Sequence, residues 1–200
     1  QKIYGPKGIG AIYVKNIEFR GQDLGGLKKR RERLPLNPKS YFLTPLVVGG
    51  GQEFGLRSGT ENVPLIVGFG KALELVLESR ERESRRTQDL KTRFFEGLRS
   101  IIPEIAINGP ELRDGIPHIL NVHIPHQKSE DLLLKLDLSG IAVSAGSACT
   151  ARAAVPSYIL QAMGYSRERA ASSLRISFGR QTTKREIDKA LKVIKMVMKK

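Results

Sequence analysis

Apolar residues recur at helical spacing over a stretch of about 35 residues beginning at Val63, and this stretch constrains the fold most strongly. The positions that keep the spacing are Val63, Ile66, Val67, Gly70, Leu73, Val76 and Leu77, followed by Leu90, Phe94 and Leu98. Between the two groups, the sequence ESRERESRRTQD is dense in charge, which is typical of a solvated helix face. Because a helix of this length often bridges two packed units, we expect one helix to join two parts of the chain.

Short elements of alternating type follow Pro103. The sequences IAING, HILNVHI and SSLRISFGR have the composition of strands. The sequence SEDLLLKLDLSG predicts a helix with Ser129 as its N-cap and Gly140 at its end, and PSYILQAMG predicts a shorter helix. The last helix opens with Thr183 and Glu186 at capping-box spacing. The whole pattern predicts an α/β fold.

The chain before the long helix is polar and rich in glycine. Residues 8–15, GIGAIYVK, predict a strand, and residues 16–44 predict a basic loop or hairpin. The sequence GGGQEFGLRSGT must make tight turns or approach another group closely, because glycine tolerates backbone conformations that other residues avoid. Its glycines, hydroxyls and arginine suit an anion such as a phosphate, and they equally suit an ordinary glycine-rich connection.

The only cysteine of the chain, Cys149, stands among small and hydroxylated residues in VSAGSACTAR. Reactive thiols occupy partly exposed, electropositive surroundings, and Arg152 supplies a positive charge nearby. A small buried hydrophobe is the alternative interpretation of the same residue. A single cysteine forms no internal disulfide, so we expect a reducing, cytoplasmic setting.

Two cationic residues are further candidates. Lys2 precedes a Gly-Pro turn in KIYGPKGIG, where a lysine is either a surface residue or a Schiff-base residue beside a carbonyl cofactor. Arg175 lies between Leu174 and Ile176 in an expected strand. It could bind a carboxylate ligand, form an internal salt bridge or point outward. The three histidines, His118, His123 and His126, lie on or beside one expected strand and do not suggest a metal site.

The chain is strongly basic, with a net charge of +14 and a pI of about 10.1. No aromatic residues alternate with its basic clusters, so the stacking platforms of nucleic-acid binders are not indicated. A solvated surface, or a docking patch for an acidic protein, is favoured over nucleic-acid binding. No apolar run is as long as a membrane span, and we expect no membrane association.

Four of these stretches together resemble the cysteine desulfurases, which are pyridoxal-phosphate (PLP) enzymes of aminotransferase fold type I, class V. KIYGPKGIGAIYV is similar to the segment that begins at the cofactor lysine, and GGGQEFGLRSGTENV to the glycine-rich motif. GIAVSAGSACTARAAVPSYILQAMG is similar to the segment of the catalytic cysteine, and SSLRISFGRQTTKREID to that of the substrate-binding arginine. The four motifs occur in the family's order along the whole chain.

The resemblance implies a role for each candidate residue. Lys2 would hold PLP covalently and move protons, and Thr60 of the partner subunit of a homodimer would bind the cofactor phosphate. Arg175 would bind the carboxylate of L-cysteine through a bidentate pair. Cys149 would attack the substrate sulfur, releasing L-alanine and keeping a persulfide. The persulfide would pass to an acceptor for iron–sulfur cluster assembly or for tRNA thiolation.

The resemblance also implies a domain plan. Residues 1–62 would end the PLP-binding large domain, residues 63–102 would form the connecting long helix, and residues 103–200 would form a small α+β C-terminal domain with the cysteine loop. The family's first half, with its ring-stacking histidine and pyridine-binding aspartate, has no counterpart here, and Gln1 stands where the family usually has histidine. We therefore expect a C-terminal half that is active only with the missing half. The alternative is a non-enzymatic sulfur carrier or scaffold-docking module derived from the same fold.

Overall fold

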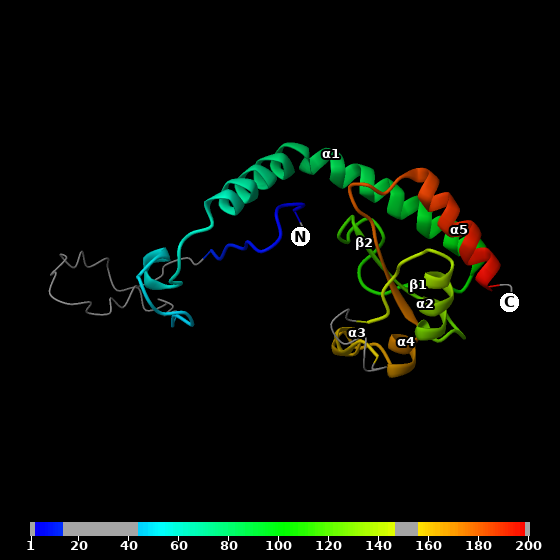
Figure 1. Ribbon diagram of the computed structural model, residues 1–200. Helices are drawn as coiled ribbons and strands as arrows, with labels where there is room; N and C mark the ends of the chain where they lie inside the picture. Colours follow the sequence, from blue (N-terminus) through cyan, green and yellow to red (C-terminus); the bar gives the residue numbers. More distant parts are fainter. Residues whose placement is uncertain (1–2, 14–43, 147–155, 199–200) are drawn as a thin grey trace. The chain divides into compact units, whose positions relative to one another are not determined.

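A computed structural model describes residues 3–13, 44–146 and 156–198, so Lys2, Cys149 and the basic segment lie outside the described residues. The chain divides into two compact units, Gln1–Glu78 and Ser79–Lys200. The division falls inside α1 (Val63–Ile101), a continuous helix of 39 residues (Figure 1). The long helix predicted from the apolar spacing is thereby confirmed. The domain boundaries at 62 and 102 stay a prediction.

In the first unit, the glycine-rich segment folds into consecutive tight turns around the short 3-10 helix η1 (Glu53–Gly55). Gly51, Gly55 and Gly59 have φ values of 80°, 77° and 122°, a region that residues with a side chain rarely adopt. The prediction of tight turns is confirmed. The strand predicted over residues 8–15 is wrong for its described part, since residues 8–13 pair with no other described segment.

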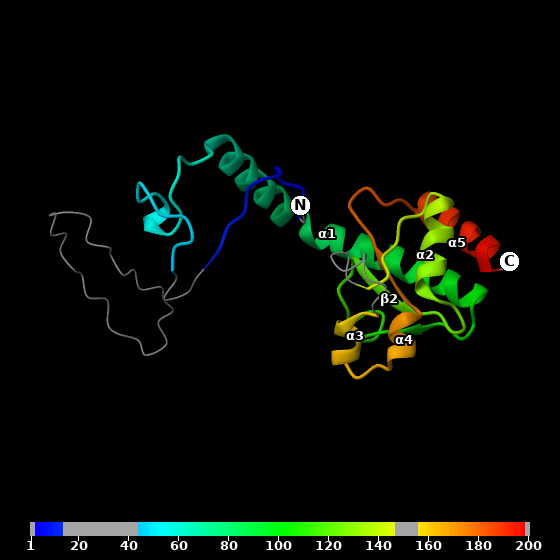
Figure 2. The same ribbon diagram turned by 60° about the horizontal axis from the view of Figure 1, so that its bottom comes forward.

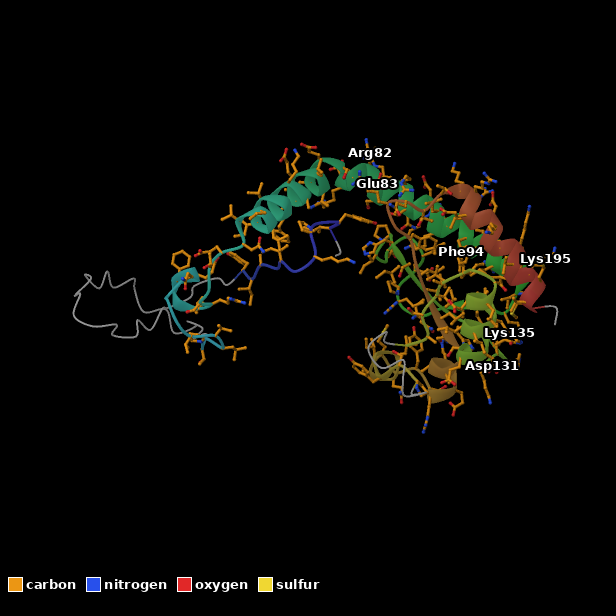
Figure 3. The ribbon with its side chains drawn as sticks, in the orientation of Figure 1. Arg82, Glu83, Phe94, Asp131, Lys135 and Lys195 are labelled. Carbon is orange, nitrogen blue, oxygen red and sulfur yellow. The ribbon has the colours of Figure 1, made fainter. Side chains whose placement is uncertain are left out.

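In the second unit, the C-terminal part of α1 packs onto a three-stranded antiparallel sheet. The strands are β1 (Ala106–Ile107), β2 (Ile119–His123) and β3 (Ser173–Ser177), in the order β1-β2-β3. Leu90, Phe94 and Leu98 of α1 are 2–3% exposed, and the Phe94 ring meets the edge of the Phe178 ring at a centroid distance of 5.8 Å. Figure 3 labels Phe94 in this part of α1, and Arg82 and Glu83 in the charged part that precedes it.

The two faces of the sheet differ in chemistry because strand side chains alternate between them. Leu120 and Val122 of β2, and Leu174 of β3, are buried in the apolar core. Asn121 and Arg175 point to the opposite face, as cross-strand partners on β2 and β3. The sheet therefore presents one apolar and one polar face.

Four further helices complete the unit: α2 (Ser129–Leu138), α3 (Tyr158–Ala162), α4 (Arg167–Ala171) and α5 (Lys184–Met198). Helix α5 lies along the C-terminal part of α1 in both ribbon views (Figures 1 and 2), and Leu191 packs directly against Gly97. The capping box of α5 is confirmed, because the Glu186 carboxylate accepts from the backbone N–H of Thr183 at 2.7 Å. Ser129 is not the N-cap of α2, because the helix already includes it.

Within the described ranges, no helix is long and apolar enough to cross a membrane.

The side chain of Lys91 lies almost fully inside the second unit, at 2% exposure. Its Nζ donates one hydrogen bond to the Ile116 carbonyl at 3.1 Å, and burial lowers its pKa from 10.5. A lysine whose folded pKa is lowered destabilises the fold while it is charged. The free energy of unfolding should therefore rise as pH increases from the folded pKa towards 10.5.

We expect Lys91→Met to raise the free energy of unfolding at pH 7 by about 1 kcal/mol, because methionine fills the site without burying a charge. The difference from the parent protein should shrink by pH 10, where the lysine is losing its proton. Urea unfolding at the two pH values measures this. A difference that is the same at both would show that the charge of Lys91 is not the cause.

Candidate functional site

Arg175 lies in the middle of the sheet's polar face. Its backbone N–H donates to the Ser144 carbonyl at 2.7 Å, and its carbonyl accepts from the Ser144 N–H at 3.0 Å. On its other side, β2 places Asn121 directly opposite. Arg175 is half-buried, and among the described residues no hydrogen bond or ion pair engages its guanidinium. Of the three predicted alternatives, the internal salt bridge is therefore not found within the part of the chain that the structure describes.

The described chain that precedes Cys149 is paired with Arg175. Ser144 is the residue paired with Arg175, and the described chain continues from it to Gly146. It resumes at Pro156, and Ser157 then caps α3 by accepting from the Leu160 N–H at 3.4 Å. Hydrogen bonds thus hold the described chain on both sides of residues 147–155, at Ser144 and at Ser157. Cys149 itself lies outside the described residues.

A second arginine, Arg169 of α4, forms hydrogen bonds at the end of β1, beside the same polar face. Its Nε donates to the Asn108 Oδ1 at 2.7 Å and its Nη2 to the Ile107 carbonyl at 3.1 Å. Its guanidinium stacks over the Tyr165 ring at 4.4 Å from the centroid. This geometry suits a cation–π contact, and the two hydrogen bonds join α4 to the end of β1.

Three residues of this face were not predicted from the sequence: Asn108, Asn121 and Arg169. Asn121 interrupts the apolar sequence HILNVHI, and a polar residue in the middle of a half-buried strand was the available signal. Asn108 and Arg169 are 61 positions apart, so their contact could not be read from local spacing.

The imidazole of His123 also belongs to the polar face. Its Nδ1 is 2.9 Å from the Ser172 hydroxyl, and burial, with a contribution from Arg169, lowers its pKa. The lowered pKa favours the neutral imidazole at neutral pH. Within residues 3–13, 44–146 and 156–198, no three histidine, cysteine or carboxylate side chains are grouped to hold a metal ion.

Thr60 lies in the first unit, at the entrance to α1. It follows Gly59 and is exposed, while the Asn62 side chain accepts from the Leu65 N–H at 3.3 Å and caps the helix. The neighbouring turn is already satisfied internally, since the Gly59 N–H donates to Gln52 Oε1 at 3.0 Å. The Thr60 hydroxyl is therefore accessible for a ligand. Thr60 and Arg175 belong to different units, and each is described within its own.

The order of these parts along the chain is that of a known family. The Aminotransferase class-V model matches residues 1–190. The chain belongs to the aminotransferase class-V family.

Within the aminotransferase class-V family, the chain is similar to two curated cysteine desulfurases. It is 41% identical over 193 residues to cysteine desulfurase IscS of Photorhabdus laumondii subsp. laumondii, covering 96% of this chain and 42% of the relative. It is 38% identical over 199 residues to cysteine desulfurase IscS of Clostridium botulinum strain Hall, covering 99% and 44%. The chain thus spans less than half the length of these relatives.

Solved structures of the same family agree with the fold. A NifS-like protein matches with a TM-score of 0.67 and 32% identity, over 84% of this chain and 40% of that one. A NifS-like protein from Rickettsia africae matches with a TM-score of 0.67 and 31% identity, over 78% and 40%. The expected fold class, α/β and the C-terminal part of a fold type I transferase, is confirmed.

Proposed function

We propose that the protein containing this chain is a cysteine desulfurase, which converts L-cysteine to L-alanine and holds the sulfur as a persulfide on Cys149. The observation that carries the proposal is the placement of Arg175. Arg175 is half-buried and its guanidinium has no described protein partner, while its backbone is hydrogen-bonded to Ser144, five residues before Cys149. The similarity to two cysteine desulfurases over nearly the whole chain supports the same assignment.

Arg175 would bind and orient the substrate. Its planar guanidinium matches a carboxylate with two parallel hydrogen bonds, and its charge is not neutralised by any described side chain. Cys149 follows Ser144 by five residues, a reach of at most about 18 Å along an extended chain. A thiol tethered at that distance can meet a substrate anchored on Arg175.

The sulfur transfer needs only one nucleophile. The Cys149 thiolate would form a bond to the substrate sulfur while the substrate carbon–sulfur bond breaks. The electron pair of that bond stays with the carbon, which takes up a proton before L-alanine leaves. No external oxidant is required, because the substrate carbon is reduced as the two sulfurs become linked.

Among the described residues, Thr60 fits a contact with PLP. Thr60 presents an accessible hydroxyl beside the glycine-rich turns, and we propose that in a homodimer it binds the phosphate of the cofactor held by the other subunit. Lys2 would hold the cofactor through its amine. When bound, PLP supplies the electron sink that carbon–sulfur cleavage needs.

The cofactor assignment is tested by absorbance. The complete protein with PLP should show a visible band of the lysine-bound cofactor, and Lys2→Ala should abolish it. Lys7→Ala is the matched control, because Lys7 is an exposed lysine of the same turn. A band that survives in Lys2→Ala, or one that disappears equally in both variants, would rule out Lys2 as the attachment point.

The net charge of +14 favours one alternative, a non-enzymatic sulfur carrier that docks on an acidic partner. L-Alanine formation by the complete protein separates the two functions, because a carrier accepts sulfur without producing alanine. We further propose a cytoplasmic enzyme whose acceptor serves iron–sulfur assembly or tRNA thiolation.

A further inference from the structure

A chain of polar side chains crosses the sheet from α4 to Arg175. Arg169 donates to Asn108 Oδ1 at 2.7 Å, and Asn108 Nδ2 donates to Asn121 Oδ1 at 2.8 Å. Asn121 is in turn the cross-strand partner of Arg175. The chain therefore ends at the residue that would bind the substrate carboxylate.

The direction of every hydrogen bond in this chain is fixed. A guanidinium can only donate, so Arg169 must face the amide oxygen of Asn108. Asn108 Nδ2 also donates to Ser173 Oγ at 2.8 Å, whose own proton goes to the Arg169 carbonyl at 2.6 Å. Because Asn108 donates to Asn121 through its amino group, Asn121 accepts with its amide oxygen. Its amide NH₂ is left on the side away from Asn108, towards β3.

The pairing geometry brings this NH₂ close to Arg175. The backbone bonds Ile124 N–H to Ser172 and Phe178 N–H to His118 mark the hydrogen-bonded positions of the β2–β3 ladder. The pair of Asn121 and Arg175 lies at the alternate, non-hydrogen-bonded position. Side chains of such pairs approach most closely, with Cα atoms about 4.5 Å apart.

The Asn121 NH₂ and the Arg175 guanidinium thus belong to paired positions of neighbouring strands, and neither can accept from the other. The Asn121 NH₂ has no hydrogen-bond partner among the described residues, and neither has the Arg175 guanidinium. Both groups reach solvent, since no buried side-chain nitrogen lacks a partner among the described residues, and water or a ligand therefore supplies the acceptor. A carboxylate offers about four lone pairs, enough for the arginine fork and one further donor.

We infer that Asn121 is a second ligand for the substrate carboxylate, and that Arg169 and Asn108 position its amide. Identifying the anion as an amino-acid carboxylate rests on the proposed function. The donor pair itself rests only on the geometry of the sheet. The donor pair predicts selectivity for the free acid, because a neutral ester is a weaker acceptor for both donors.

Calorimetric titration of the complete protein, loaded with its cofactor, tests this with L-alanine and L-alanine methyl ester. Asn121→Ala should weaken L-alanine binding about tenfold, the effect of losing one hydrogen bond to a charged group, and should change ester binding less than twofold. Asn121→Asp keeps the oxygen that Asn108 needs but neutralises Arg175, so it should weaken L-alanine binding further. Gln181→Glu, the same amide-to-acid change at an exposed position outside the chain of side chains, is the control.

Three outcomes would overturn the inference: unchanged L-alanine affinity in Asn121→Ala, an equal loss for acid and ester, or no binding of L-alanine by the parent protein. An equal loss would indicate that Asn121 only supports the fold. The proposed function fails separately, if the parent protein produces no L-alanine from L-cysteine. A selective loss of L-alanine affinity in such an inactive protein would still support Asn121 as a carboxylate ligand.

Discussion

Arg175→Ala in the complete protein should lower kcat/KM for L-cysteine by about 10²- to 10⁴-fold. Each hydrogen bond to a charged group is worth about 1.5–3 kcal/mol, and a bidentate pair has two of them. Most of the loss should appear in KM, because the guanidinium holds the carboxylate in the ground state as well as later. Steady-state kinetics of L-alanine formation measure both constants.

The shape of the guanidinium is tested with Arg175→Lys, which keeps the charge but loses the planar fork. We expect it to recover only part of the lost efficiency. Arg167→Ala removes an exposed cation from α4 and serves as the control for net charge. If Arg167→Ala is as damaging as Arg175→Ala, general electrostatics explains the effect, and carboxylate binding by Arg175 does not.

Cys149→Ser should reduce sulfur release from L-cysteine by about 10³-fold or more, because a serine hydroxyl cannot replace a thiolate as the attacking group. L-Alanine binding and the absorbance of the bound cofactor should remain unchanged, since neither needs the thiol. Sulfide assay, mass detection of a persulfide on the parent protein and calorimetry together measure these properties.

The pair of variants separates binding from sulfur transfer. Arg175→Ala should lose affinity for L-alanine while a persulfide can still form at high substrate concentration, and Cys149→Ser should show the reverse. Undiminished sulfide release by Cys149→Ser would exclude the persulfide role. The result would not affect the assignment of Arg175.

Elements with a strong local pattern were predictable from the sequence. The helix from Val63 followed from its repeated apolar spacing, and β2 and β3 followed from their apolar composition. Helix α4 was missed because its sequence, RERAA, has no large apolar residue to set a spacing, whereas α3, of the same length, stands between a proline and a glycine that mark its ends. The strand expected over residues 8–15 failed in its described part because a strand also requires a neighbour, which local composition does not specify.

The residues of the candidate site likewise divide into one that the sequence predicted and several that it did not. Arg175 was found because a charged residue stood between two apolar ones in a strand, although its orientation was left open. Its surroundings were not found. Asn108, Asn121 and Arg169 meet through strand register and through a helix 61 residues beyond Asn108, and these are properties of the folded chain.

The anchoring of the cysteine segment has an evolutionary consequence. Its two anchors, the Ser144–Arg175 pair and the Ser157 cap of α3, both lie outside residues 147–155. Insertions or deletions between the anchors leave the backbone of Arg175 in place. If the proposed roles hold, the length of this segment can change, and with it the reach of the thiol, while the position of Arg175 is inherited unchanged.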